Sequence, residues 1–223
     1  EADAAVRAAE SRSVLAALGV PAEQIYFLGY PDTGMPYEES FLRRLYDGCR
    51  VSASRWGRTE TWRPDGQDFH FMRSGCHSTY TAASVLRDLS DVLALVNPDT
   101  VYVTAPGDCH GDHDALGRFT TQAVAAMENP PALYYYLIHA DRTDIWPERD
   151  AERFRLPPMA ADHPLLRCAA ERRPLPDGFP PAEKYSLIQS YTSQDPAAYN
   201  GYLLAFAKND ELVFRVERLP SRT

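Results

Sequence analysis

The sequence predicts one α/β domain, residues 1–223, with a Rossmann-like, three-layer α/β/α architecture and a mainly parallel sheet. Short apolar runs typical of buried strands lie at residues 25–28, 100–104 and 132–138. Stretches with helical periodicity alternate with them. Strands that alternate with helices imply βαβ units, in which a parallel sheet carries helices on both faces. A chain of 223 residues is long enough to bury one substantial core.

The first predicted helix covers residues 3–18, where four aliphatic residues recur among many alanines and Gly19 provides a C-cap signal. The run at residues 25–28, Ile-Tyr-Phe-Leu, predicts a short buried strand between Gly29 and the preceding turn. Residues 29–82 are rich in glycine, proline, aspartate, serine and arginine. They predict a long ordered excursion with one short helix at Phe41–Tyr46, and ordered loops of this length are usually functional.

Residues 84–96 give the clearest helical pattern, with aliphatic residues on one face and Ser84 as a candidate N-cap. Asn97-Pro98-Asp99 ends this helix, and the strand at residues 100–104 follows. A second helix is expected from about His113 to Met127, before the strand at residues 132–138. Later in the chain we expect a loop, a helix and a terminal hairpin, at residues 141–182, 183–194 and 202–217 respectively.

Composition excludes two classes of function. The formal net charge of −8 argues against nucleic-acid binding, which depends on a basic surface. The sequence contains no run near the roughly 18 consecutive apolar residues of a membrane-spanning helix.

Residues 108–114, Asp-Cys-His-Gly-Asp-His-Asp, are the densest group of potential metal ligands in the chain. They lie where a predicted strand passes into a helix, and ligands of parallel sheets bind beyond the carboxyl ends of strands. Imidazole and carboxylate groups suit zinc, and His110 and His113 could both reach one ion. Alternatively one histidine binds the ion and the other faces the substrate, while Asp112 orients a ring. A purely structural interpretation also exists, because Asp108 or Asp112 could simply cap the helix.

The segment containing His110-Gly-Asp112-His113 resembles the second signature of the PIG-L (LmbE-like) zinc-dependent N-deacetylase family. Three other stretches resemble the family in the right order, and together they cover nearly the whole chain. They are Arg7-Ala-Ala-Glu10, Phe27-Leu-Gly-Tyr-Pro-Asp32, and Lys184 with Tyr191 and Ser193-Gln194.

The family's first signature, His-Pro-Asp-Asp-Glu, is not in the sequence. In the family it supplies two zinc ligands and the catalytic carboxylate. Because the chain begins with a helical stretch and without Met, we expect a preceding segment, with the first strand region, to be missing from this sequence. The alternative is a family member that has lost its metal signature.

The resemblance implies specific roles. His113 matches a ligand of one Zn²⁺ per chain, with the other ligands expected in the missing segment. His110 matches the catalytic histidine that stabilises the oxyanion or protonates the leaving amine, and Asp112 matches the carboxylate that tunes it. Arg7 and Asp32 match substrate-contacting positions. His139, at the end of a predicted strand, is more often a structural histidine, but it could lie over the substrate.

The implied activity is hydrolysis of the acetyl group from a small-molecule N-acetylated amino sugar or sugar conjugate. Two alternatives remain: a metal-dependent hydratase on the same fold, and a non-catalytic binding member. The four cysteines lack the spacing of a zinc finger. Their number allows disulfides, of which Cys49–Cys76 is the best candidate. A reduced protein with free thiols explains the same number almost as well. Residues 134–147 resemble exported members of the family, which favours an extracytoplasmic protein over a cytoplasmic one.

Overall fold

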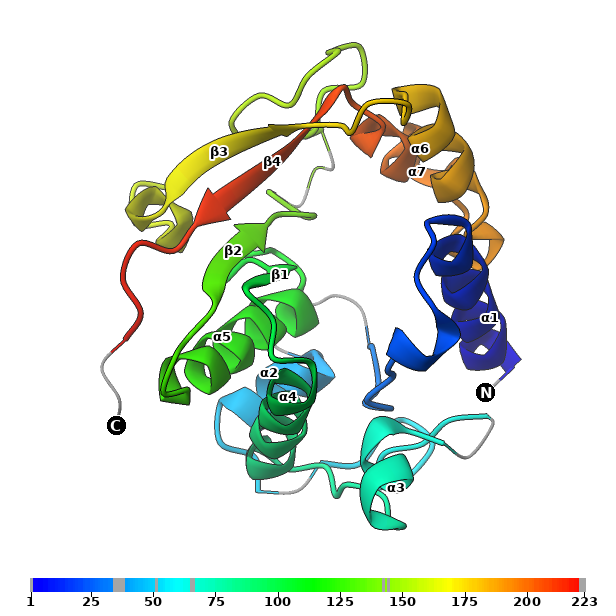
Figure 1. Cartoon of the computed structure of the whole chain (residues 1–223), viewed down its shortest axis with the longest axis vertical. Coiled ribbons are helices and arrows are strands. Elements are labelled where there is room, and N and C mark those ends of the chain that lie inside the picture. Colours follow the sequence, from blue (N-terminus) through cyan, green and yellow to red (C-terminus); the bar gives the residue numbers. More distant parts are fainter. Residues whose placement is uncertain are drawn as a thin grey trace.

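A four-stranded mixed sheet forms the centre of the fold, with strand order β1-β2-β4-β3 (Figure 1). The computed structural model describes residues 2–33, 39–50, 52–64, 67–141, 143 and 145–220. Strand β1 (Thr100–Thr104) pairs in parallel with β2 (Ala132–Tyr136). Strand β4 (Asp210–Arg215) pairs antiparallel with β2 and with β3 (Ala169–Pro174).

The architecture is therefore mixed α/β, as expected, but the predicted parallel pairing holds only for β1 and β2 among the described strands. The helix α5 (Gly111–Ala126) connects these two strands, and a helical crossover of this kind produces parallel neighbours. The chain reaches β4 from the opposite direction, so the other two pairings are antiparallel.

The helices predicted from periodicity are present, with small shifts at their ends. They are α1 (Ala2–Ala17), α2 (Phe41–Tyr46), α4 (Ala82–Val96), α5 and α6 (Pro181–Gln189), followed by the short 3-10 helix η4 (Thr192–Gln194). Helix α4 begins two residues before the predicted cap, because Thr81 rather than Ser84 is the N-cap and accepts a 3.1 Å hydrogen bond from Ser84 N. Asn97 ends α4 in the left-handed conformation, with φ of 46°.

The predicted strand at residues 25–28 is wrong. This segment is extended but joins no sheet within the described residues. Its backbone instead bonds to the long excursion, where Phe27 O accepts from Phe69 N at 2.8 Å and Gly29 O accepts from Trp62 N at 3.1 Å. The excursion also contains a helix that periodicity did not reveal, α3 (Phe69–Ser74).

The predicted C-terminal hairpin is also wrong. Residues 202–207 contain the 3-10 helix η5 (Leu203–Phe206), which follows the short helix α7 (Ala198–Gly201). The partner of β4 is β3, which lies inside the segment predicted as loop. Strand β3, Ala-Ala-Glu-Arg-Arg-Pro, is a largely exposed edge strand without apolar alternation, so the sequence carried little strand signal there.

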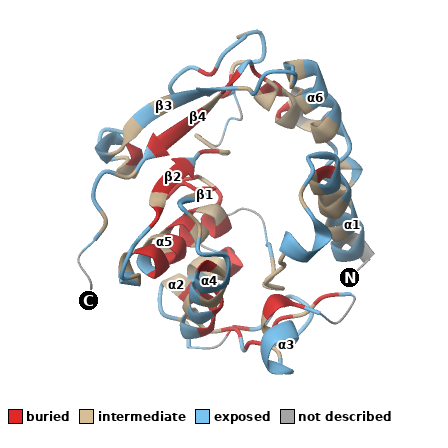
Figure 2. Cartoon of the chain, viewed as in Figure 1, coloured by how far each residue is buried: buried red, intermediate tan, exposed pale blue. Residues whose placement is uncertain are grey.

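Helices α1 and α6 lie on the other side of the view from β1, β2 and α5 (Figure 1). Helix α1 contacts η4, the 3-10 helix that follows α6. Buried residues concentrate on β2, β4 and the sheet-facing side of α5 (Figure 2). A second apolar cluster joins α2, α4 and α5 around Phe41, Leu45, Tyr80 and Phe119.

None of the described helices is both long and apolar enough to span a bilayer. All four cysteines are free thiols, so the candidate Cys49–Cys76 disulfide does not form.

Gly117 sets the distance between α5 and β1. A Cβ atom at this position would lie 2.3 Å from Thr104 O and 2.9 Å from Pro106 N, closer than real carbon contacts allow. The first turn of α5 is also tied to β1, because Thr104 Oγ1 donates a 2.9 Å hydrogen bond to His113 O.

We predict that Gly117→Ala lowers the free energy of unfolding by up to about 2 kcal/mol in urea denaturation. In an ordinary helix the same change would stabilise by about 1 kcal/mol, but overpacking against a backbone carbonyl costs about 1–3 kcal/mol. Ser90→Ala, at an exposed position of α4, is the control and should change stability by less than about 0.5 kcal/mol. A stabilising Gly117→Ala change would contradict the close packing of α5 on β1.

Candidate active site

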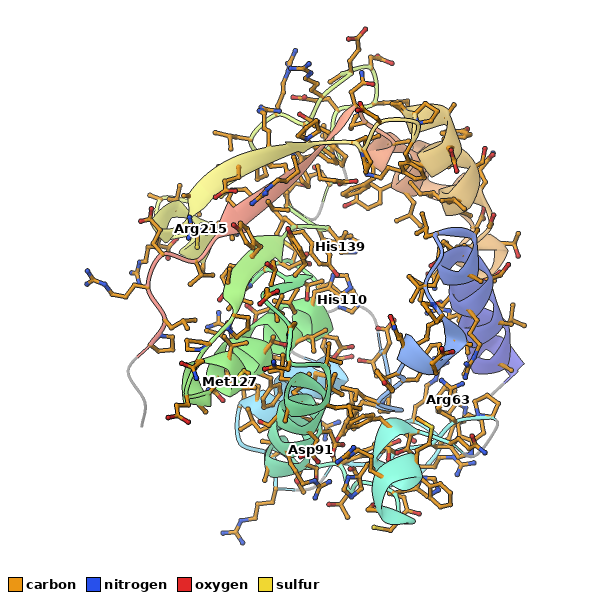
Figure 3. The ribbon with its side chains drawn as sticks, viewed as in Figure 1. Arg63, Asp91, His110, Met127, His139 and Arg215 are labelled. Atoms are coloured by element: carbon orange, nitrogen blue, oxygen red, sulfur yellow. The ribbon has the colours of Figure 1, made fainter. Side chains whose placement is uncertain are left out.

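Three histidines, His110, His113 and His139, converge at the carboxyl ends of β1 and β2. Figure 3 labels two of them, His110 and His139. His110 is the N-cap of α5 and His113 lies one turn further, so both side chains project from the same end of the helix. Their rings stack with centroids 4.3 Å apart. His139 follows β2, and its ring centroid lies 5.8 Å from that of His110 and 5.4 Å from that of His113. The parallel pairing of β1 and β2 explains this convergence, because it brings the two loops to the same edge.

The buried carboxylate of Asp108 holds these loops together. Its Oδ2 accepts hydrogen bonds from Ile138 N at 3.0 Å and His139 N at 3.1 Å, and its Oδ1 accepts one from His110 N at 2.9 Å. Oδ1 also lies 3.4 Å from His113 Nδ1. Burial opposes ionisation of Asp108, but the His113 ring and the backbone donors outweigh it and lower the pKa of this carboxyl. Asp108 thus contacts the backbone or ring of all three histidines. In the sequence, it was interpreted only as a ligand or a cap.

The two α5 histidines present the same ring nitrogen, Nε2, to the cavity, but its protonation differs between them. His110 Nδ1 accepts a 3.3 Å hydrogen bond from Asp112 N, so its Nε2 carries the proton of the neutral ring and faces Asp32 Oδ1 at 3.5 Å. His113 Nδ1 is buried and faces the Asp108 carboxylate, without the alignment of a full hydrogen bond. That contact favours the proton on Nδ1 and leaves the lone pair of Nε2 available to a metal ion. Burial and the charge of His113 lower the pKa of His110 to about 4, which keeps its ring neutral at pH 7.

Asp32 lies next to His110, and Arg7 lies next to Asp32; the resemblance matches both residues to substrate-contacting positions. Arg7 Nη1 is 3.5 Å from Asp32 Oδ2, and the other carboxylate oxygen of Asp32 faces His110. Gln194, with its amide oxygen turned toward the guanidinium, accepts from Arg7 Nε at 3.0 Å. The sequence marks Gln194 as part of the resembling C-terminal stretch and does not pair it with Arg7.

Contacts between α1 and η4 bring two of the resembling stretches together. Glu10 accepts hydrogen bonds from Thr192 Oγ1 at 2.7 Å and from Ser193 N at 2.9 Å, and it also accepts one from Ser193 Oγ. These residues are more than 180 positions apart in the chain. The contacts fix α1, and with it Arg7, relative to the C-terminal segment.

The carboxylate of Asp112 binds Thr33 and the start of α2 and makes no hydrogen bond to a histidine ring. Its carboxylate accepts from Thr33 N at 2.9 Å, Thr33 Oγ1 at 3.1 Å and Leu42 N at 2.7 Å. Burial raises the pKa of Asp112, against the opposing effect of these hydrogen bonds. One ligand atom each from Asp32, His110 and Asp112 nevertheless lies within 4.8 Å of the others, so the three could also surround a cation. No sequence signal identified Thr33 or Leu42 as the partners of Asp112.

A second group with possible ligand atoms, His70, Asp88 and Asp91, lies outside the histidine cluster. Its central carboxylate, Asp88, already accepts hydrogen bonds from Tyr30 Oη at 2.8 Å and from Ser78 Oγ at 2.6 Å. The Arg87 guanidinium also contacts Asp88, at 3.0 Å, and its positive charge disfavours a cation there. We interpret this group as a structural network that joins the excursion to α4.

The residues at the histidine cluster have the nitrogen and oxygen donors that suit zinc, and the free Nε2 of His113 fits the role of a ligand. A cavity of about 710 Å³ adjoins the cluster and is lined by Arg7, Asp32 and Thr33 among others. Its size suits a small organic ligand.

The family model for GlcNAc-PI de-N-acetylase (PIG-L) matches residues 1–124 of the chain. The match covers more than half of the 223 residues, and the chain belongs to the PIG-L family. Members of this family are generally hydrolytic N-deacetylases of GlcNAc-like substrates and are typically metal-dependent. Neither the curated proteins nor the solved structures provided a match to this chain.

We predict that Asp108→Asn lowers the free energy of unfolding by about 1–3 kcal/mol at pH 7, because an amide cannot accept from both sets of buried N–H donors. The lowered pKa fixes the sign of the pH dependence. The carboxylate stabilises the fold fully above its ordinary pKa of about 4, and this contribution is lost as the pH falls through the lower folded-state value.

The measurement is urea denaturation of both proteins from pH 7 down into acid. The difference in stability should persist at mild acidity and shrink only in strongly acidic solution. Asp162→Asn, at an exposed loop position, is the control. Equal stability of Asp108→Asn and the parent at pH 7 would contradict the organising role of Asp108.

Proposed function

We propose that the protein is a zinc-dependent N-deacetylase that removes the acetyl group from an N-acetylated amino sugar or sugar conjugate. The observation that carries this proposal is the different protonation of Nε2 in the two α5 histidines. His113 directs Nδ1 to the Asp108 carboxylate and keeps Nε2 for an ion, whereas His110 bonds through Nδ1 and keeps Nε2–H as a donor. One histidine is thus suited to metal binding and its neighbour to hydrogen-bond donation.

His113 would hold the ion, together with ligands that the first family signature provides where it is present. When bound, zinc lowers the pKa of a coordinated water to about 7 and polarises an amide carbonyl.

His110 would donate a hydrogen bond from Nε2–H to the carbonyl oxygen of the substrate as negative charge develops there. The ring is largely buried and stacked on His113, so the donor is oriented before the reaction begins. Its low pKa makes this donor a neutral imidazole at pH 7. Hydrolysis adds one water across the C–N bond: its oxygen joins the carbonyl carbon and one of its protons goes to the nitrogen, so the products are acetate and a free amine.

Arg7 and Asp32 would orient the sugar. Both are about half exposed and line the cavity, and their ion pair lies directly beside His110. Asp112 would act indirectly, because its hydrogen bonds to Thr33 and Leu42 hold the loop that carries Asp32. His139 faces both other histidines and would border the substrate or brace their rings.

We predict that His113→Ala abolishes bound zinc and that His110→Ala retains zinc but loses about 100–1000-fold in kcat, as expected for loss of an oxyanion donor. Zinc is measured by elemental analysis of purified protein, and activity by acetate release from an N-acetylated amino sugar. Acetate release also distinguishes deacetylation from hydration of a double bond.

His77→Gln is the matched control. This histidine binds Asp68 in the excursion, away from the cluster, and its replacement should alter neither zinc content nor kcat. Absence of zinc in the parent protein, together with unchanged activity in His113→Ala, would refute the proposed function.

A further inference from the structure

Cys76, His70 and Asp88 form a chain of contacts where α3 lies beside α4 (Figure 1). The Sγ atom of Cys76 lies 3.9 Å from His70 Nε2, within hydrogen-bond reach of sulfur. The other ring nitrogen, His70 Nδ1, lies 3.3 Å from Asp88 Oδ1. A nucleophile next to a base, with a third group that orients the base, is the arrangement that activates cysteine in enzymes. Among the described residues, those that line the cavity beside the histidine cluster include none of these three.

The turn that ends α3 folds Cys76 back toward His70. Gly75 has φ of 76°, in the left-handed region, and its N–H donates a 2.8 Å hydrogen bond to Phe71 O. Ser74 Oγ donates to His70 O at 2.8 Å and lies 3.3 Å from Cys76 Sγ. The sulfur thus has a polar group on each side, the Ser74 hydroxyl and the imidazole.

The buried carboxylate of Asp88 decides which nitrogen of His70 carries the proton. Asp88 is fully buried, and it is held by a hydrogen bond from Tyr30 Oη and by the Arg87 guanidinium. An ionised carboxylate can only accept hydrogen bonds, so it favours the proton of the neutral imidazole on Nδ1. Nε2 then directs its lone pair toward Cys76 Sγ. The His70 side chain is only 13% exposed, which restricts the ring to this orientation.

Cys76 is also accessible to reagents in solution. All four cysteines lie in described parts of the chain and are free; Cys76 is exposed, whereas the other three are partly buried. Burial raises the pKa of the Cys168 thiol, which leaves less of the reactive thiolate at neutral pH. Cys49 packs against the apolar cluster of α2, α4 and α5. Cys76 therefore combines exposure with an adjacent base, and reactive cysteines need both thiolate formation and access.

We propose that Cys76 is a site of reversible thiol modification, at which a small disulfide exchanges with the cysteine. His70 Nε2 takes the thiol proton, and Sγ attacks one sulfur of the disulfide. The new Sγ–S bond forms as the S–S bond of the reagent breaks, and the leaving thiolate receives the proton from His70. One disulfide is consumed, and the products are a mixed disulfide on Cys76 and one small thiol, so no other oxidant is needed. Asp88 acts through His70 as a positioning residue. This inference is independent of the proposed function.

The test is the rate of mixed-disulfide formation in the purified protein at pH 7, with oxidised glutathione as the reagent. Mass spectrometry of peptides after acid quenching assigns the modified cysteine. We expect Cys76 to react at least about tenfold faster in the folded protein than in the urea-unfolded chain, because only the fold places a base at the sulfur. A thiol that is merely exposed would react as fast or faster after unfolding. Free cysteine measured in the same solutions corrects for the effect of urea.

His70→Gln should lower the rate at Cys76 in the folded protein to that of the unfolded chain, because glutamine cannot take the thiol proton. His77→Gln is the matched control. This histidine follows Cys76 directly in the sequence, but its Nδ1 binds Asp68 and its ring stacks on Phe71, so its replacement should leave the rate unchanged. Circular dichroism and thermal unfolding verify that both variants are folded.

A reaction at Cys76 that is no faster in the folded parent than in the unfolded chain would overturn the proposal. So would a folded His70→Gln variant that keeps the parental rate, or a His77→Gln variant that loses as much as His70→Gln. If His70→Gln does not fold, the comparison of folded and unfolded parent decides by itself.

Discussion

The candidate site depends on the parallel pairing of β1 with β2 and on the buried Asp108 carboxylate that joins their ends. Parallel pairing places the two following loops at one edge of the sheet. Asp108 then binds backbone N–H groups from both loops, through His110 on one side and Ile138 and His139 on the other. A charge without exposure to water is stable only when it is compensated in this way. The same group that holds the loops together also faces His113, so the fold and the chemistry share one interaction.

The cavity depends on segments far apart in the sequence. Glu10 of α1 binds Thr192 and Ser193, and this contact places Arg7 opposite the helix that carries His110. Asp112 extends the arrangement in the other direction, because its carboxylate binds Thr33 and Leu42 and thereby positions the segment after Asp32. The excursion also lines the cavity and is joined to Gly29 through Trp62. Polar contacts between distant segments thus help to hold the cavity together.

Much of the fold could be predicted because the relevant signals are local. Helix α4 shows aliphatic periodicity, and β1 is an apolar run that ends at Pro106 and Gly107. The errors arose where a segment's partners lie elsewhere in the chain. Residues 25–28 are apolar because they pack against the excursion, as the edge contact of Tyr26 with Phe69 shows, and not because they belong to the sheet. Strand β3 is polar and exposed, and only its pairing with β4 makes it a strand.

Residue type and spacing are enough to indicate the family, the helix-terminal cluster of His110, Asp112 and His113, and the order of the stretches that accompany it. How the side chains are used depends on contacts between distant parts of the chain. The tertiary structure assigned Asp112 to Thr33 and Leu42 and gave Asp108 the contacts with all three histidines. The physical reason is that hydrogen bonds and charges act across a few ångströms of space, and residue order does not specify which distant groups come that close.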